Sequence, residues 1–130
     1  MTHLEHAALW VDNLEKICAF YEKYLGAAIG QLYENPRTGF SSRFANFEAG
    51  ARLEIMTTST LTPERLAPGV HRHGLTHIAF SLGSEAAVDE LTARLNSDGH
   101  TVLDGPRRTG DGYYESVALD PEGNRIELTA

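Results

Sequence analysis

The chain has 130 residues, 42% of them hydrophobic and 22% charged, which suits one globular domain with a real core. Eighteen acidic residues against 11 basic ones give a net charge of -7, and no basic cluster occurs, which argues against nucleic-acid binding. The single cysteine, Cys18, excludes an internal disulfide. Because no apolar run approaches the roughly 18 residues of a membrane span and the first residues lack a signal-peptide pattern, we expect a cytoplasmic protein.

The first half of the chain predicts a strand, a helix and three further strands. Residues 4–11 alternate in the manner of a half-buried strand. A helix should begin at a cap on Asp12 or Asn13, because Asp12 and Glu15 have the spacing of a capping box. It should end at Gly26, and its apolar stripe comprises Leu14, Ile17, Cys18, Tyr21, Tyr24 and Leu25. The strands that follow are expected over residues 28–34, 39–48 and 51–57.

The second half repeats this order after a Thr- and Pro-containing linker at about residues 58–73. Residues 75–82 alternate like the first strand, and Ser84 should cap a helix that ends at Gly99. The apolar stripe of this helix comprises Val88, Leu91 and Leu95. Three more strands are expected over residues 100–105, 112–119 and 124–129, the last of them after a DPEGN turn.

This order of elements predicts an α+β fold. Two tandem βαβββ modules, at about residues 3–57 and 74–130, would form a single domain over residues 1–130. We expect their curved mixed sheets to surround a cavity.

The chain also repeats itself in sequence, which supports this division. GARLEI at residues 50–55 matches GNRIEL at residues 123–128, and LEH at residues 4–6 resembles LTH at residues 75–77. A histidine therefore opens each half and a glutamate closes it. The spacing from His6 to Glu54 is 48 residues and that from His77 to Glu127 is 50. Two matched pairs in the same order are much harder to obtain by chance than one.

Strand alternation places these four residues on equivalent faces. His6 shares a face with Trp10, whereas Leu9 and its neighbours on the other face are apolar and should pack under the helix. Glu54 and Glu127 likewise alternate with aliphatic residues. If the sheets surround a cavity, both histidines and both glutamates should converge inside it. The preceding arginines, Arg52 and Arg125, should form local salt bridges or lie at the rim.

Two imidazoles and two carboxylates are suitable ligands for a divalent transition metal. The set contains no cysteine, and carboxylates favour an open site that retains exchangeable positions, which is a catalytic layout. A lone strand histidine is more often a hydrogen-bonded core residue, and a lone strand glutamate usually faces solvent. The repeat favours the metal site. Four other histidines have no repeat partner, namely His3, His71, His73 and His100. Cys18, inside a helix, is interpreted as a buried structural thiol.

The sequence resembles the vicinal oxygen chelate superfamily, which includes glyoxalases, bleomycin-resistance proteins and extradiol dioxygenases. The segments EHAALWVDNLEKICAFYEKYLGA, LTHIAFSL and DPEGNRIEL carry the resemblance, which covers nearly the whole chain. The His, Glu, His, Glu order is similar to that of glyoxalase I (lactoylglutathione lyase). The resemblance implies that His6, Glu54, His77 and Glu127 bind the metal. Nickel or zinc is the first expectation, and cobalt, manganese or iron also fit.

The resemblance implies an isomerase-type reaction in which Glu127 is the general base and Glu54 can serve the opposite face. It also implies a homodimer, a small-molecule substrate and, within the glyoxalase type, a thiol adduct. Glutathione-dependent members typically have an arginine where Trp10 stands and often an asparagine where Thr58 stands, so the substrate is left open. Candidate substrate-binding residues are Trp10, Arg43, Tyr113 and Tyr114. The alternatives are an epimerase, a thiol transferase, a dioxygenase and a non-catalytic drug-binding protein on the same scaffold.

Overall fold

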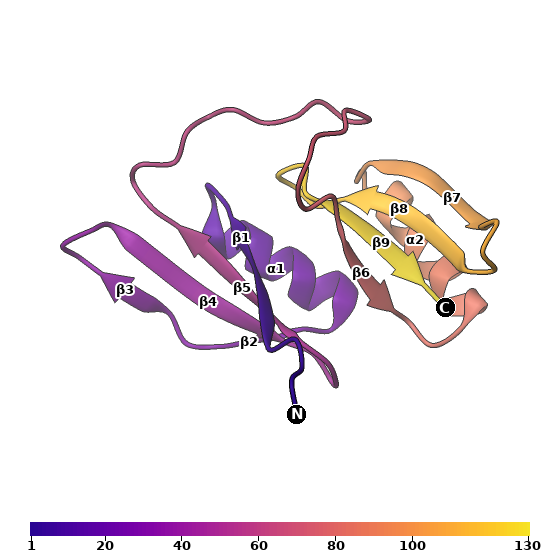
Figure 1. The fold of residues 1–130 in the computed structure, drawn as a ribbon, viewed down its shortest axis with the longest axis horizontal. Helices are drawn as coiled ribbons and strands as arrows, with labels where there is room; N and C mark the ends of the chain where they lie inside the picture. The colour runs from indigo at the N-terminus through magenta and orange to yellow at the C-terminus, as the bar shows by residue number, and fades with distance from the viewer. The chain divides into compact units, whose positions relative to one another are not determined.

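The structure, a computed structural model, describes residues 1–130 and divides between Pro63 and Glu64 into two units. The division falls inside the predicted linker. Each unit contains one mixed sheet and one helix (Figure 1), so the α+β prediction is confirmed. None of the helices combines the length and the apolar character that crossing a membrane requires.

The first unit contains one helix and a five-stranded sheet. In chain order its elements are β1 (His6–Trp10), α1 (Leu14–Leu25), β2 (Ala28–Ile29), β3 (Tyr33–Asn35), β4 (Phe40–Asn46) and β5 (Arg52–Thr57). The strand order is β1-β5-β4-β2, with β3 also paired to β4. Strands β1 and β5 are parallel, whereas β4 is antiparallel to its neighbours. Figure 1 shows α1 along one face of this sheet.

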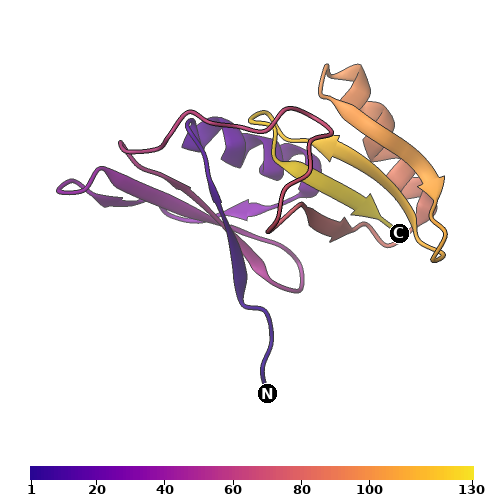
Figure 2. The same cartoon turned by 45° about the horizontal axis from the view of Figure 1, so that its top comes forward.

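The second unit has the same plan with four strands. Its elements are β6 (Ile78–Ser81), α2 (Glu85–Ser97), β7 (Val102–Arg108), β8 (Tyr114–Leu119) and β9 (Arg125–Thr129). The order β6-β9-β8-β7 again pairs the first and last strands in parallel. Figure 2 shows α2 lying along one side of this sheet. A buried hydrogen bond of 2.6 Å between the hydroxyls of Thr92 and Ser116 joins α2 to β8.

The core of each unit lies between its helix and the helix-facing side of its sheet. Leu53 and Ile55 on β5 are almost fully buried, as are Ile126 and Leu128 on β9. The residues between them are only partly buried, which confirms the predicted alternation. The buried stripe of α1 contains the predicted residues except Leu25, and it also contains Phe20. Burial of these apolar side chains is the main stabilising term for both units.

The first helix begins one residue later than a capping box would require. Asn13 is the cap, and its Oδ1 accepts the backbone N–H of Lys16 at 3.0 Å. Asp12 precedes the cap, so the predicted box between Asp12 and Glu15 does not form. Gly26 ends the helix with φ 66°, the left-handed conformation that glycine adopts without strain. In the second unit Ser84 caps α2 as predicted.

Three predicted strands depart most from the observed bounds. The strand expected at residues 28–34 is broken into β2 and β3, and after β2 the carbonyl of Gly30 accepts the guanidinium of Arg43 at 2.8 Å. The strand expected at residues 75–82 is shorter, and His77 lies just before β6. The strand expected at residues 100–105 begins at Val102 and continues to Arg108. Its pairing with β8 has one register shift before Asp104 and one after it.

Gly105 on β7 should be intolerant of any side chain. Its φ is +81°, and a Cβ there would lie 2.7 Å from the backbone oxygen of Glu115. Gly105→Ala therefore combines backbone strain with a clash that backbone movement must relieve, and we expect a loss of about 2–4 kcal/mol in the free energy of unfolding. Denaturant unfolding measures it. Gly83→Ala is the matched control, because Gly83 has φ +83° but open space around it. Equal losses for both variants would contradict the clash.

Candidate functional site

The first unit brings His6 and Glu54 together on the sheet face opposite α1. Parallel pairing sets Ala8 of β1 opposite Glu54 of β5. His6, two residues before Ala8, therefore lies on the same face of the sheet as Glu54. His6 Nε2 and Glu54 Oε1 are 3.8 Å apart, and the two side chains are 42% and 19% exposed. Because Leu53 and Ile55 point to the other face, the glutamate does not enter the apolar core.

The second unit forms an equivalent pair from His77 and Glu127. His77 Nε2 and Glu127 Oε2 are 3.2 Å apart, with side-chain exposures of 35% and 18%. Glu127 lies on β9 between the buried Ile126 and Leu128. We call the His6–Glu54 and His77–Glu127 pairs the two half-sites. Both place an imidazole Nε2 toward a carboxylate.

The other nitrogen of each imidazole is held by the residue that precedes it in the chain. His6 Nδ1 lies 2.6 Å from Glu5 Oε2, and His77 Nδ1 lies 2.6 Å from Thr76 Oγ1. Neither Glu5 nor Thr76 was predicted from the sequence. Their only signal was their position directly before each repeated histidine. Such contacts orient a histidine ring and direct Nε2 toward a ligand.

Arg52 forms the local salt bridge that the sequence predicts. Its guanidinium contacts the carboxylate of Glu5 and lies over the ring of Phe44, with 3.9 Å from Cζ to the ring centroid. Phe44 also meets the His6 ring edge to face at 5.5 Å. The hydrogen bonds from His6 and Arg52 lower the pKa of Glu5, so this carboxyl stays ionised near neutral pH.

The face around Glu127 is richer in charge than the repeat indicated. Glu115 on β8 lies beside Glu127, and burial together with this neighbouring carboxyl raises the pKa of Glu115. On β7 the guanidinium of Arg107 pairs with Asp104 at 2.5 Å, and this contact lowers the pKa of Asp104. A hollow of about 290 Å³ lies on this face, lined by Ala79, Asp111, Tyr113, Glu115, Glu127 and Thr129.

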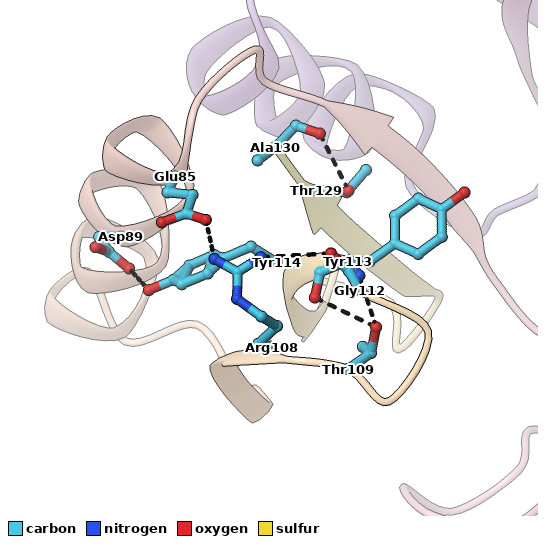
Figure 3. Close-up of polar contacts among 9 residues, drawn as sticks. All are labelled: Glu85, Asp89, Arg108, Thr109, Gly112, Tyr113, Tyr114, Thr129 and Ala130. Atoms are coloured by element: carbon cyan, nitrogen blue, oxygen red, sulfur yellow. Dashed lines mark hydrogen bonds and ion pairs between the residues drawn. The ribbon is translucent and has the colours of Figure 1, made fainter.

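Tyr113, at the end of the β7–β8 connection, and Tyr114, the first residue of β8, point in different directions (Figure 3). The Tyr114 hydroxyl donates to Asp89 on α2, and this contact raises the pKa of Tyr114. Arg108 lies 5.6 Å from the centroid of the Tyr114 ring and pairs with Glu85 of α2. Tyr113, in contrast, lines the hollow beside Glu127. Tyr114 thus fastens the connection to the helix, and only Tyr113 faces the half-site.

The other two candidate substrate-binding residues, Trp10 and Arg43, lie on opposite faces of the first sheet. Trp10 is 52% exposed on the His6 face, where it meets Phe40 edge to face at 6.1 Å. Arg43 instead points to the helix side, because it pairs with Ile55 in the ladder and its Nε donates to Glu15 of α1 at 2.9 Å. Arg43 and Tyr114 are therefore structural links between sheet and helix, each away from the half-site of its own unit.

No group of three or more histidine, cysteine, aspartate or glutamate side chains gathers in an arrangement that could hold a metal ion. Each half-site contributes one imidazole and one carboxylate. Each pair alone therefore falls short of the four or more ligands that divalent transition metals take.

Known proteins with a similar sequence or fold include several glyoxalases and related proteins. The family described as "Glyoxalase/Bleomycin resistance protein/Dioxygenase superfamily" matches residues 3–128. The uncharacterized protein YqjT of Bacillus subtilis is 30% identical over 98% of both chains. A putative glyoxalase from Bacillus halodurans is 27% identical, with a TM-score of 0.73 over 98% of this chain and 94% of that one. The trypanothione-dependent glyoxalase I of Leishmania major has the same fold, with 20% identity, a TM-score of 0.78 and coverage of 99% and 86%.

Cys18 should be unreactive in the folded protein. Its side chain is buried in α1, and burial raises the pKa of the thiol to about 11. At about pH 8 the thiolate fraction is then roughly a hundredfold below that of an unperturbed cysteine, which slows alkylation by at least that factor. Iodoacetamide labelling followed by mass spectrometry measures the rate, with the protein in denaturant as the control. Equal rates in both conditions would contradict the buried position.

Proposed function

Because this chain belongs to the glyoxalase/bleomycin resistance protein/dioxygenase superfamily, we propose that it is a metal-dependent lyase or isomerase of the glyoxalase I type. The observation that carries the proposal is the pair of matched half-sites. In each of them a neighbouring side chain occupies Nδ1 of the histidine, and Nε2 faces a glutamate. A histidine that serves only the core would have no reason to repeat this arrangement in both modules.

The donor chemistry fits a divalent metal. His6 and His77 would supply nitrogen, and Glu54 and Glu127 would supply oxygen, a set suited to nickel or zinc and also to cobalt, manganese or iron. When bound, the metal supplies Lewis acidity that polarises a substrate carbonyl. It would also offset the cost of partly burying two carboxylates. The two half-sites can come from one chain or from the two chains of the expected homodimer.

Two carboxylates of the chain itself, Glu127 and Glu54, would carry out the proton transfer. Glu127 removes the proton from the carbon next to the carbonyl and returns it to the adjacent carbon, and Glu54 serves the opposite face. When the hydroxyl proton of the hemithioacetal carbon also moves to the former carbonyl oxygen, the product is a 2-hydroxy thioester. This isomerisation has no net change in atoms or electrons, so no oxidant is required. The hollow beside Glu127 supplies room for the substrate, with Tyr113 on its wall.

Trp10 is the second candidate contact with the substrate. It is half exposed and packs against Phe40, so it can meet an apolar or planar substituent. This same aromatic surface favours a second candidate function, a non-catalytic protein that binds an aromatic small molecule. Elemental analysis separates the two, because a metal-dependent enzyme of the cytoplasm should purify with, or readily acquire, one equivalent of metal per site.

Metal removal should abolish turnover. We expect EDTA-treated protein to lose activity toward methylglyoxal mixed with glutathione or another low-molecular-weight thiol. Nickel or zinc should then restore it, since the carbonyl is no longer polarised without the ion. Thioester absorbance measures the rate. Conversion that survives complete chelation would contradict the metal-dependent mechanism. Failure with every thiol at full metal occupancy would instead favour an epimerase or another substrate.

Glu127→Gln should retain metal and lose most turnover. The amide oxygen can still bind the ion, but the side chain can no longer accept a proton, so kcat should fall by about 100- to 10,000-fold. Metal content and kcat are measured on the same sample. Glu90→Gln, an exposed position on α2, is the control for loss of one charge. Wild-type kcat in Glu127→Gln at full occupancy would remove Glu127 from the role of base.

A further inference from the structure

We propose that the two half-sites have different tasks, and that Glu5 is the positioning residue that makes the first of them the metal anchor. The second half-site is held less strictly, which suits the one that contains the base, Glu127. This inference rests on the proposed function. It concerns a residue that neither the repeat nor the ligand pattern identifies.

The carboxylate of Glu5 determines which nitrogen of His6 carries the proton. An ionised Glu5 can only accept hydrogen bonds, so its contact of 2.6 Å requires the proton of neutral His6 to be on Nδ1. Nε2 then keeps its lone pair, and it is Nε2 that faces Glu54. Glu5 therefore selects the tautomer that binds a metal.

Glu5 is itself held in place. Arg52 contacts its carboxylate, and the backbone N–H of Arg52 donates to the carbonyl of Glu5 at 2.9 Å. The guanidinium of Arg52 stacks on Phe44, and Phe44 packs against the His6 ring. Glu5, Arg52, Phe44 and His6 thus form a closed set of contacts around the imidazole. The ring loses little further conformational freedom when Nε2 binds an ion.

The second module lacks this arrangement. Thr76 stands where the first module has Glu5, and a hydroxyl can either donate to or accept from His77 Nδ1. Both neutral tautomers of His77 are therefore compatible with the contact. No anionic acceptor fixes the His77 ring from this position, as Glu5 fixes that of His6. The first half-site is therefore the more rigidly oriented of the two.

Metal affinity tests this difference without reference to activity. We expect Glu5→Gln to raise the Kd for Ni²⁺ and for Zn²⁺ about 10- to 100-fold in competition with a chromophoric chelator, because the anionic acceptor is lost. Thr76→Val is the matched change in the other module and should alter either Kd by no more than about threefold. Arg52→Gln should weaken binding in the same direction as Glu5→Gln, and its counterpart Arg125→Gln should not.

A second measurement needs no metal at all. In the metal-free protein at about pH 8, nitrogen-15 NMR should show neutral His6 mainly as the Nδ1–H tautomer. Neutral His77 should show more of the Nε2–H tautomer, because its Nε2 lies 3.2 Å from the Glu127 carboxylate. Glu5→Gln should raise the Nε2–H share of His6, while circular dichroism and Tm confirm that the variant is folded.

The outcomes separate the inference from the proposed function. If the wild type binds metal but Glu5→Gln and Thr76→Val shift Kd equally, or not at all, the division of tasks is wrong and the metal site stands. The same holds if His6 and His77 show the same tautomers. If the wild type binds neither ion, the proposed function and this inference both fail.

Discussion

The parallel pairing of the first and last strands of each module is the constraint on which the site depends. Parallel neighbours need a long connection, and here that connection contains the helix and the remaining strands of the module. The pairing of β1 with β5 and of β6 with β9 sets an alanine opposite each glutamate, and the histidine two residues before that alanine lies close to the glutamate side chain. Residues far apart in sequence thus become neighbours through backbone hydrogen bonds alone, before any side-chain attraction contributes.

Helix packing then decides which face is available for chemistry. Leu53, Ile55, Ile126 and Leu128 take one side of their strands into the core, so the intervening glutamates must occupy the other. A one-residue slip in register would bury both carboxylates under the helices and expose the aliphatic residues. The same hydrophobic burial that stabilises each unit therefore also protects the placement of its half-site.

The sequence was sufficient for the fold class, both helices and the four residues of the half-sites, because strong periodicity and an internal repeat determine them. It was insufficient for Glu5, whose role depends on contacts with the His6 ring and with Arg52 from another strand. Arg43 was predicted to contact the substrate, but in the ladder it pairs with Ile55 and it points to the helix side. This placement follows from the register of β4 against β5, which the sequence pattern does not determine. The contact between the Arg43 guanidinium and the Gly30 carbonyl joins residues on separate segments, and no local propensity describes it.

The half-sites also have an evolutionary consequence. A module with one imidazole and one carboxylate provides two donors, so an ancestor of half the length would have needed a second copy of itself to bind an ion strongly. Two identical subunits must carry the same residue at every position. Once both copies are encoded in one gene, a glutamate can precede the histidine in one and a threonine in the other. A difference such as that between Glu5 and Thr76 cannot arise between two identical copies of one module.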